Sequence, residues 1–333
     1  MNSKNIVIIG ATGAVGREML ICLEKLNFPI KKLRLVASEK SAGKSLSTPF
    51  GKIKIETISE KVFAESDIAL FSAGSGISKE WRKRVVKNDC LMIDNSSAFR
   101  NEKGVPLVVP QINAKEAKKH KGVISNPNCT TAIAVVALHP IHKAFGLKKI
   151  IISTYQATSG AGAKGMDELL NQTKEVLTNK KITKEAFAHQ IAFNIIPHID
   201  TFEENGYTRE EMKVSWETKK IFGDEKLLIS CTAVRIPTFR AHSESIVIET
   251  KKPITEKSAR NILQKAKGVV IVDDPAKNKY PMPLNASNKF DVEVGRIRQN
   301  PVFGKNGLEF FVSGDQLLRG AALNAVEIAK LFV

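Results

Sequence analysis

The sequence predicts an α/β protein of two domains, the first built on a parallel sheet and the second on a mixed, largely antiparallel sheet. Three observations support this prediction. The chain has 333 residues, which is enough for two domains and a sizeable core. It opens with an apolar strand, a glycine-rich turn and an amphipathic helix. From residue 227 onward, short β-type runs alternate with turns.

Composition narrows the class of protein. The 43% hydrophobic and 26% charged residues are typical of a globular chain. The sequence contains no run of about 18 apolar residues, the length that a membrane-spanning helix needs. Residues 6–15 are apolar but lack a basic lead-in beyond Lys4, so no signal peptide is expected. The four cysteines are scattered without a C-x-x-C pair, which argues against a disulfide framework and against a metal site. We therefore expect a cytoplasmic protein.

The net charge of +17 raises the question of nucleic acid. The lysines and arginines are dispersed in pairs, and aromatic residues make up only 6% of the chain, too few for a base-stacking platform. We expect a lysine-rich, solvated surface that helps to attract anionic small molecules, and no nucleic-acid partner.

The first segment has the layout of a Rossmann-like dinucleotide-binding unit. A buried strand is expected at residues 5–10 and a helix at 17–26. Between them lies G-x-x-G-x-x-G, a variant of the usual G-x-G-x-x-G, whose small residues would let the backbone approach a pyrophosphate at the helix N-terminus. An ordinary strand–helix turn is the alternative. The cofactor ligands expected here are Gly10, Thr12, Gly13, Ala14 and Val15.

The loop after the second strand, residues 38–44, bears on the choice of cofactor. An acidic residue near this strand end would hold the ribose 2′-hydroxyl of NAD, whereas a basic residue with hydroxyl neighbours accommodates the 2′-phosphate of NADP. Glu39 favours NAD, but Ser38, Lys40 and Ser41 surround it and favour NADP, which we expect. A plain polar surface loop is the alternative.

The rest of the first half continues the parallel sheet. Polar residues just past the carboxyl ends of parallel strands lie where open α/β sheets bind ligands. Arg100 follows such a strand and is therefore a candidate anion ligand, although a solvated loop arginine is the alternative. The strands expected here are 33–37, 52–58, 68–74, 91–94 and 123–125, and the helices are 78–87 and 114–121.

Residues 126–131, Asn-Pro-Asn-Cys-Thr-Thr, lead directly into an apolar helix expected at 130–145. This places the Cys129 thiol at a helix N-terminus, where free N–H groups and the helix dipole favour the thiolate. Cys129 is therefore a candidate nucleophile. The alternative is a small buried cysteine beside a turn, which is the usual state of a free cysteine.

The second half is expected to mix strands and helices. A strand ending in Gln156 is followed by a glycine-rich turn that offers N–H groups to an anion or to a nicotinamide amide. Arg235 and His242 bracket the turn between two strands of antiparallel texture, so they can converge on one end of the sheet. Glu217 and Lys220 share a helix face, with a surface salt bridge as the alternative. The expected strands are 149–156, 228–235, 245–250, 269–273, 291–294 and 308–312, and the expected helices are 166–177, 210–221, 256–266 and 316–331.

A nucleotide-binding half, a cysteine at a helix start and a second sheet carrying arginine and histidine suggest oxidation or reduction of an aldehyde through a thioester. An aldehyde has no good hydride to release until a nucleophile adds, and a thiolate adduct can expel hydride to a nicotinamide ring. A nearby histidine would serve as the acid and base.

Taken in order along nearly the whole chain, the motifs resemble those of the aspartate-semialdehyde dehydrogenase family. Several could arise by chance, but their shared order could not. They are Gly-Ala-Thr-Gly-Ala-Val-Gly at 10–16, Ser-Ala-Gly-Lys at 41–44, Asn-Ser-Ser-Ala-Phe-Arg at 95–100, Asn-Pro-Asn-Cys-Thr-Thr at 126–131, Tyr-Gln-Ala-x-Ser-Gly-Ala-Gly at 155–162, Glu-Thr-Lys-Lys at 217–220, Arg-Ile-Pro at 235–237, Ala-His-Ser-Glu at 241–244 and Gly-Asp-Gln-Leu-Leu-Arg-Gly-Ala-Ala at 314–322.

The resemblance implies a role for each candidate residue. Cys129 is the nucleophile, His242 the acid and base, and Gln156 the residue that orients the acyl intermediate. Arg235 binds the substrate α-carboxylate and Glu217 its ammonium, which suits a forked guanidinium and a carboxylate. The implied phosphate ligands are Arg100 and Lys220, and the further cofactor ligands are Ser159, Gly160 and Gln316.

The resemblance also implies a reaction: NADPH reduces L-aspartyl 4-phosphate to L-aspartate 4-semialdehyde with release of phosphate, on the route to lysine through diaminopimelate, to threonine and to methionine. The implied fold is like that of glyceraldehyde-3-phosphate dehydrogenase, and the protein is a homodimer. Many relatives have arginine where Lys40 stands, so the forked contact with a 2′-phosphate is missing here.

The last helix has a small apolar face that should pack on the first domain. We therefore expect an NADP-binding domain at residues 1–128 with 313–333, and a catalytic and dimerisation domain at residues 129–312.

Two other enzyme families share the thioester chemistry, N-acetyl-glutamyl-phosphate reductase and glyceraldehyde-3-phosphate dehydrogenase. The Asn-Cys-Thr-Thr context and an ammonium partner at Glu217 argue against the first, whose substrate amine is acylated. A basic nucleotide-fold binding protein without catalysis would make Cys129 and His242 incidental.

Overall fold

A computed structural model describes residues 2–333, which form two compact units. The first comprises the chain up to Asn128 together with Ala321–Val333, and the second comprises Cys129–Gly320. The sequence-based boundary returned the chain to the first domain at residue 313. In the structure it returns at Ala321, because Gly307–Gly314 is a strand of the second sheet.

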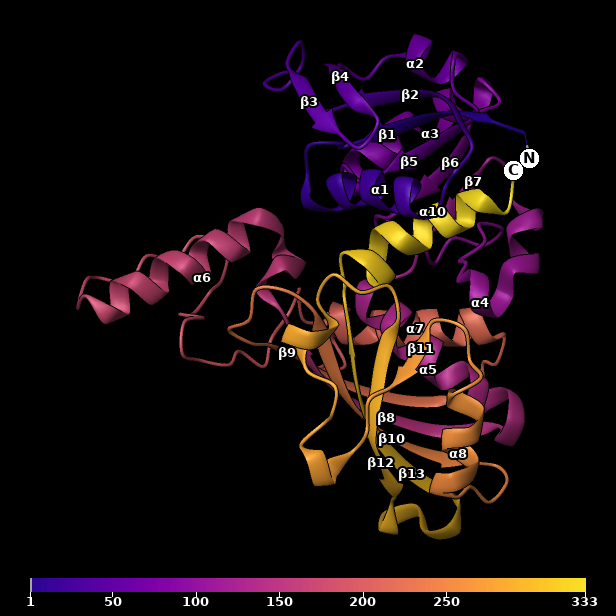
Figure 1. The fold of residues 1–333 in the computed structure, drawn as a ribbon, viewed down its shortest axis with the longest axis vertical. Helices are drawn as coiled ribbons and strands as arrows, with labels where there is room; N and C mark the ends of the chain where they lie inside the picture. The colour runs from indigo at the N-terminus through magenta and orange to yellow at the C-terminus, as the bar shows by residue number, and fades with distance from the viewer. Residues whose placement is uncertain (1) are drawn as a thin grey trace. The chain divides into compact units, whose positions relative to one another are not determined.

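The described residues of the first unit build a seven-stranded sheet in the order β3-β4-β2-β1-β5-β6-β7 (Figure 1). All neighbouring strands are parallel except the hairpin of β3 and β4. The central strands are continuous apolar runs, as expected when both faces of a parallel sheet are covered. The strands are β1 Lys4–Ile9, β2 Ile30–Val36, β3 Ser45–Thr48, β4 Gly51–Glu56, β5 Ile68–Phe71, β6 Leu91–Asp94 and β7 Val123–Ser125.

The helices of the first unit include the end of the chain, as the apolar face of the last helix predicted. Helix α10 packs against α1, and Asn324 at its start donates to the carbonyl oxygen of Val108 at 2.9 Å. This helix is shorter than expected, because the turn before it, Leu318–Ala322, is π-helical, and the expected helix at 114–121 is a short 3₁₀ segment. The helices are α1 Ala14–Lys25, α2 Glu60–Ala64, α3 Ser75–Lys87, α4 Pro110–Asn113, α10 Leu323–Lys330 and the 3₁₀ segment Ala114–Lys119.

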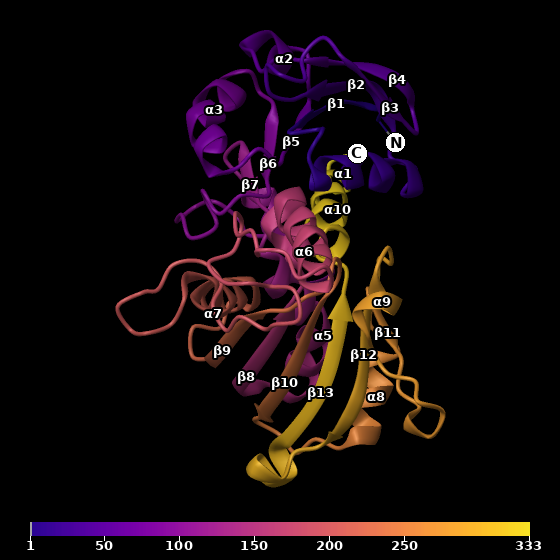
Figure 2. The ribbon, with the colours of Figure 1, turned by 90° about the vertical axis from the view of Figure 1, so that its left-hand side faces the viewer.

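In the second unit the described residues form a six-stranded sheet in the order β11-β12-β13-β10-β8-β9 (Figure 2). Its pairings are antiparallel in the middle and parallel at both edges, so the prediction of a mixed, largely antiparallel sheet is confirmed. The strands are β8 Leu147–Gln156, β9 Leu228–Arg235, β10 His242–Thr250, β11 Val269–Ile271, β12 Val292–Gln299 and β13 Gly307–Gly314.

Strands β9 and β10 are consecutive in the chain but do not pair, because β8 lies between them, parallel to β9 and antiparallel to β10. Gln156 is opposite Arg235 in the β8–β9 register, and Tyr155 is opposite Ser243 in the β8–β10 register. The last residues of β8 and β9 and the first residues of β10 therefore lie side by side at one end of the strands.

Helices α5, α7 and α8 pack on one face of this sheet. Alternation along β8 shows the two faces, since Ile150, Ile152 and Gln156 are buried whereas Ile151 and Tyr155 are exposed. Helix α6 extends away from the sheet (Figure 1). The helical segments are α5 Cys129–Phe145, α6 Gly162–Leu177, α7 Arg209–Phe222, α8 Glu256–Leu263, α9 Pro283–Ala286 and the 3₁₀ turns Thr158–Ala161, Pro275–Lys277 and Pro301–Asn306.

Among the described residues, no helix is long and apolar enough to cross a membrane.

Candidate active site

Cys129 is the first residue of α5, as its sequence context predicted. Its side chain is partly buried, and residues 130–138, which follow it in the helix, are all buried. Gly320 lies against it so closely that a Cβ at position 320 would be 2.6 Å from the Cys129 Cβ. The thiol therefore lies at the positive end of α5, with the backbone of Gly320 packed against its residue.

His242 is the partner of this thiol. Its Nε2 lies 3.5 Å from the Cys129 Sγ, and its Nδ1 accepts a hydrogen bond of 3.1 Å from the backbone N–H of Ala157. Because Nδ1 is the acceptor, the proton of the neutral ring is assigned to Nε2, facing the sulfur. The ring is fully buried, and burial, followed by the positive charge of Arg235, holds the pKa of His242 well below its usual range.

Arg235 binds the other backbone group of the same residue. Its Nη1 donates to the carbonyl oxygen of Ala157 at 2.6 Å, so one residue orients both the histidine and the guanidinium. Burial lowers the pKa of Arg235, and the negative charge of Glu210 opposes that shift. Gly160 is also adjacent, since a Cβ there would lie 2.7 Å from Nη1 and 3.4 Å from the His242 Cε1.

Gln156 is buried at the end of β8. Its Oε1 accepts a hydrogen bond of 3.0 Å from the hydroxyl of Thr154, and its Nε2 donates to the Oε1 of Glu210 at 3.2 Å. Both ends of the amide are thus engaged, and one of the two Nε2 protons is left over after the bond to Glu210.

Glu217 and Lys220 lie on α7, three residues apart, as the sequence predicted. Glu217 is 1% exposed and Lys220 is partly buried, so neither is an ordinary surface residue. The helix is fixed at its start by a capping box between Thr208 and Glu211 and ends at Gly223 with a φ of 65°. A buried acid on a well-defined helix is suited to bind a cationic group.

Ser159 and Gln316, expected as cofactor ligands, are bonded to each other in the structure. The Oε1 of Gln316 also accepts a hydrogen bond of 2.8 Å from the backbone N–H of Ala241. Ala241 has a φ of 66°, a left-handed conformation that is costly for a residue with a side chain, and it directly precedes His242. Gln316 therefore stabilises the turn that presents the histidine.

The glycine-rich loop of the first unit fits a dinucleotide. Gly10 has a φ of 87°, and a Cβ there would lie 2.4 Å from the carbonyl oxygen of Ser72, so only glycine is accommodated. Helix α1 begins at Ala14, and its N-cap Gly13 provides no side-chain cap. The N–H groups of this first turn are those that bind a pyrophosphate in such units. Thr12 and Val15 lie in the same turn.

The loop beyond β2 is a turn that carries the predicted cofactor ligands Ser38, Lys40 and Ser41. Ser38 and Lys40 are exposed and Ser41 is partly buried, in a turn closed by a 2.8 Å bond from the N–H of Ser41 to the carbonyl oxygen of Ser38. Hydroxyls and a lysine at the carboxyl end of the second strand are compatible with a 2′-phosphate.

Arg100 is not a solvated loop residue. It is 8% exposed, and its guanidinium donates to the carbonyl oxygens of Asn126 and Asn95 at 2.9 Å and 2.7 Å. These carbonyls follow β7 and β6, so Arg100 lies at the carboxyl edge of the first sheet.

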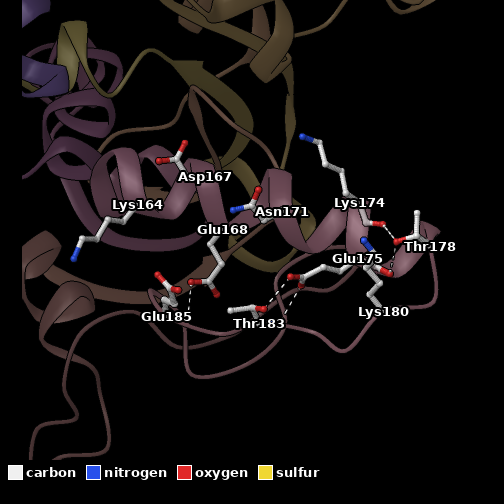
Figure 3. Close-up of a pocket in the computed structure, with 10 residues that line it drawn as sticks. All are labelled: Lys164, Asp167, Glu168, Asn171, Lys174, Glu175, Thr178, Lys180, Thr183 and Glu185. Carbon is white, nitrogen blue, oxygen red and sulfur yellow. Dashed lines mark hydrogen bonds between the residues drawn. The ribbon is translucent and has the colours of Figure 1, made fainter.

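A cavity of about 620 Å³ lies elsewhere, between α6 and the loop after it (Figure 3). Glu168 and Glu175 turn toward this loop, where they accept backbone hydrogen bonds from Glu185 and Thr183. The cavity contains none of the expected site residues, so we do not assign the chemistry to it. Within residues 2–333, no group of three or more histidine, cysteine or acidic side chains could hold a metal ion.

The structure thus brings Cys129, Gln156, Arg235 and His242 together in the second unit, where the N–H and the carbonyl of Ala157 bind His242 and Arg235. Sequence reasoning missed four residues of this cluster: Thr154, Ala157, Glu210 and Gly320. Ala157 and Gly320 stand inside motifs quoted above, but nothing in a single sequence marks a backbone N–H or a missing Cβ as functional.

Comparison with known proteins agrees with this geometry. The profile described as "Semialdehyde dehydrogenase, NAD binding domain" matches residues 5–120, and that described as "Semialdehyde dehydrogenase, dimerisation domain" matches residues 138–319. The chain is 50% identical over 332 residues to an aspartate-semialdehyde dehydrogenase of Aquifex aeolicus (strain VF5), covering 98% of this chain and 97% of that protein. It is 44% identical to the Bacillus subtilis (strain 168) protein of the same name, over 98% of this chain and 96% of that one.

A crystal structure of aspartate semialdehyde dehydrogenase II complexed with ASA, from Vibrio cholerae, has the same fold. The TM-score is 0.96 and the identity 39%, over 100% of this chain and 98% of that chain. With profiles, sequences and structure in agreement over nearly the full length, the chain belongs to the aspartate-semialdehyde dehydrogenase family.

Proposed function

We propose that the protein catalyses the NADPH-dependent reductive dephosphorylation of L-aspartyl 4-phosphate to L-aspartate 4-semialdehyde through a thioester on Cys129. One observation carries this proposal: the Cys129 Sγ stands at the N-terminus of α5, 3.5 Å from the Nε2 of a fully buried histidine. A thiol in that position is suited to nucleophilic attack.

Each side chain of the site has its own role in the reaction. The Cys129 sulfur attacks the acyl carbon, a C–S bond forms, and the C–O bond to phosphate breaks. Bound NADPH would supply the hydride that reduces the thioester. His242, with its proton on Nε2 facing the sulfur, donates a hydrogen bond that stabilises the thiolate before attack and on its release, and the oxygen of the tetrahedral adduct between these two steps. The free Nε2 proton of Gln156 is available to that oxygen.

Substrate recognition is assigned to the charged residues nearby. Arg235 keeps several N–H donors besides the one bonded to Ala157, and a guanidinium fork matches the α-carboxylate. Glu217, buried on α7, is assigned to the ammonium group. Lys220 and Arg100 are assigned to the phosphate.

We assign the pyrophosphate and adenosine ribose of NADP to the first unit, and the chemistry to the second. Gly10, Thr12, Gly13, Ala14 and Val15 would hold the pyrophosphate, because their turn leaves the start of α1 open to an anion. The preference for NADP over NAD rests on the adenosine ribose loop, whose assigned ligands are Ser38, Lys40 and Ser41. Ser159, Gly160 and Gln316 complete the assigned cofactor set.

We also propose a homodimer formed through the open face of the second sheet. Ile151 and Tyr155 are 45% and 37% exposed there, and the Tyr155 ring lies 5.9 Å from that of Phe311 on β13. An exposed aromatic cluster on a sheet face is typical of an interface core. The product would enter lysine, threonine and methionine biosynthesis.

The decisive assay follows NADP reduction with aspartate semialdehyde and phosphate, beside N-acetyl-glutamate semialdehyde and glyceraldehyde 3-phosphate. We expect turnover of the first substrate, dependent on phosphate. Cys129→Ala should abolish turnover and leave NADP binding, measured by calorimetry, unchanged. Appreciable turnover by Cys129→Ala, or preference for another substrate, would contradict the proposal.

A further inference from the structure

We propose that Glu210 is a positioning residue that fixes the amide of Gln156 for the reaction; this rests on the function proposed above. No sequence motif singled out Glu210, and it lies 54 residues from Gln156 along the chain.

Glu210 is in the first turn of α7 and is 6% exposed. Its Oε1 accepts the hydrogen bond from the Gln156 Nε2, while Thr154 donates to the opposite end of the same amide. A carboxylate can only accept and a hydroxyl here donates, so the pair selects one of the two possible orientations of the amide. The second Nε2 proton then has a defined direction.

The carboxylate of Glu210 is itself held from its other side. The Nζ of Lys213 lies 3.1 Å from the Glu210 Oε2 and 2.6 Å from the Oδ2 of Asp200, in the loop before α7. Burial lowers the pKa of Lys213, but Glu210 and Asp200 outweigh it and raise the pKa overall, so this ammonium stays charged. Gln156 is thus linked through Glu210 and Lys213 to a residue near the surface.

The charges around Arg235 also support a positioning role for Glu210. Arg235 is a buried cation close to the thiol and the histidine, and Glu210 is the first charge that offsets its burial. Lys213 is likewise offset by Asp200, whose Oδ2 lies 2.6 Å from the Lys213 Nζ. Each of these two cations therefore has a carboxylate neighbour before the substrate binds, which favours a preorganised site.

The first test compares two substitutions at one position. Glu210→Ala should lower kcat at least about tenfold, less than the 10²–10³ lost when a whole donor to the reacting oxygen is removed, because Gln156 stays but can turn. Glu210→Gln keeps an acceptor oxygen and should recover part of kcat. A Glu210→Ala kcat equal to wild type, or a Glu210→Gln kcat no higher than that of Glu210→Ala, would overturn the proposal.

The second test is a double-mutant cycle with Gln156→Ala. If Glu210 acts through Gln156, adding Glu210→Ala to Gln156→Ala should cost less than about twofold in kcat. A further tenfold loss in that background would mean that Glu210 acts by another route. Should Glu210→Ala fail to fold, Lys213→Met takes its place in the cycle, because it removes the Lys213 contact with the Glu210 Oε2 and leaves the acceptor in place.

Glu211→Ala is the matched control. Glu211 neighbours Glu210 in the same turn, but its carboxylate accepts from the backbone N–H groups of Thr208 and Ala233, at 2.6 Å and 2.8 Å. This variant should lower Tm without changing kcat. Absence of wild-type activity would contradict the proposed function, whereas an active wild type with an equally active Glu210→Ala contradicts only the role of Glu210.

Discussion

Gly320→Ala should displace the nucleophile without touching any ionisable group. The new Cβ would lie 2.6 Å from the Cys129 Cβ and 2.9 Å from its Cα. Carbon atoms in favourable contact are about 3.5–4.0 Å apart, so one of the two backbone segments has to move by about 1 Å. The Sγ to Nε2 distance of 3.5 Å would change accordingly. A misplacement of about 1 Å can cost about 100-fold in rate, so kcat should fall by about that factor, with a loss of stability of about 1–3 kcal/mol from overpacking.

Steady-state oxidation of aspartate semialdehyde measures kcat, and the pH dependence of iodoacetamide alkylation reports on the thiol separately. Gly76→Ala is the control, because a Cβ at position 76 meets nothing within 4 Å and the residue lies in α3. Alanine there should leave kcat unchanged and add up to about 1 kcal/mol of helix stability. If Gly320→Ala keeps the wild-type kcat and alkylation profile, the close approach does not position Cys129 and the reasoning is refuted.

Two further predictions concern buried ionisable groups. Arg235→Lys should reduce kcat/KM for aspartate semialdehyde by about 10- to 100-fold, mainly through KM. A lysine cannot both donate to the Ala157 carbonyl and form the two parallel hydrogen bonds that a guanidinium makes with a carboxylate. An unchanged kcat/KM would contradict the carboxylate assignment. Glu244 is fully buried, and burial raises the pKa of its carboxyl well above the usual range, so the native state keeps a proton that the unfolded chain loses above about pH 4.3. Stability from this group is full below that pH and is lost as pH rises, so Glu244→Gln should flatten the fall of Tm between pH 5 and pH 8; an identical slope in both proteins would refute a protonated Glu244.

Much of the secondary structure could be predicted because it is recorded locally. Apolar runs bounded by glycines marked the strands of the first sheet, and Cys129 could be placed at a helix start from the residues on either side of it. The expectation for the last helix was correct in its packing and wrong in its length. Its first turn is π-helical, and spacing alone does not distinguish that from an α-helix.

Strand order could not be predicted from the sequence. Strands β9 and β10 are consecutive in the chain, yet β8 separates them in the sheet. A strand's alternating pattern records which face is buried and carries no information about which strand it pairs with. The convergence of Arg235 and His242 was nevertheless expected correctly, because both lie at strand ends on the same edge.

By itself the sequence determined the residue types of the site, the glycine turn before α1 and the position of Cys129 at the start of α5, since each depends on neighbours within a few residues. Only the tertiary structure decided which atoms contact these site residues. The N–H and carbonyl of Ala157 bind His242 and Arg235, Glu210 binds Gln156 from another helix, and Gly320 makes room for Cys129. Hydrogen bonds to backbone and contacts through a missing Cβ depend on distance in space, and no pattern of side chains along the chain encodes that distance.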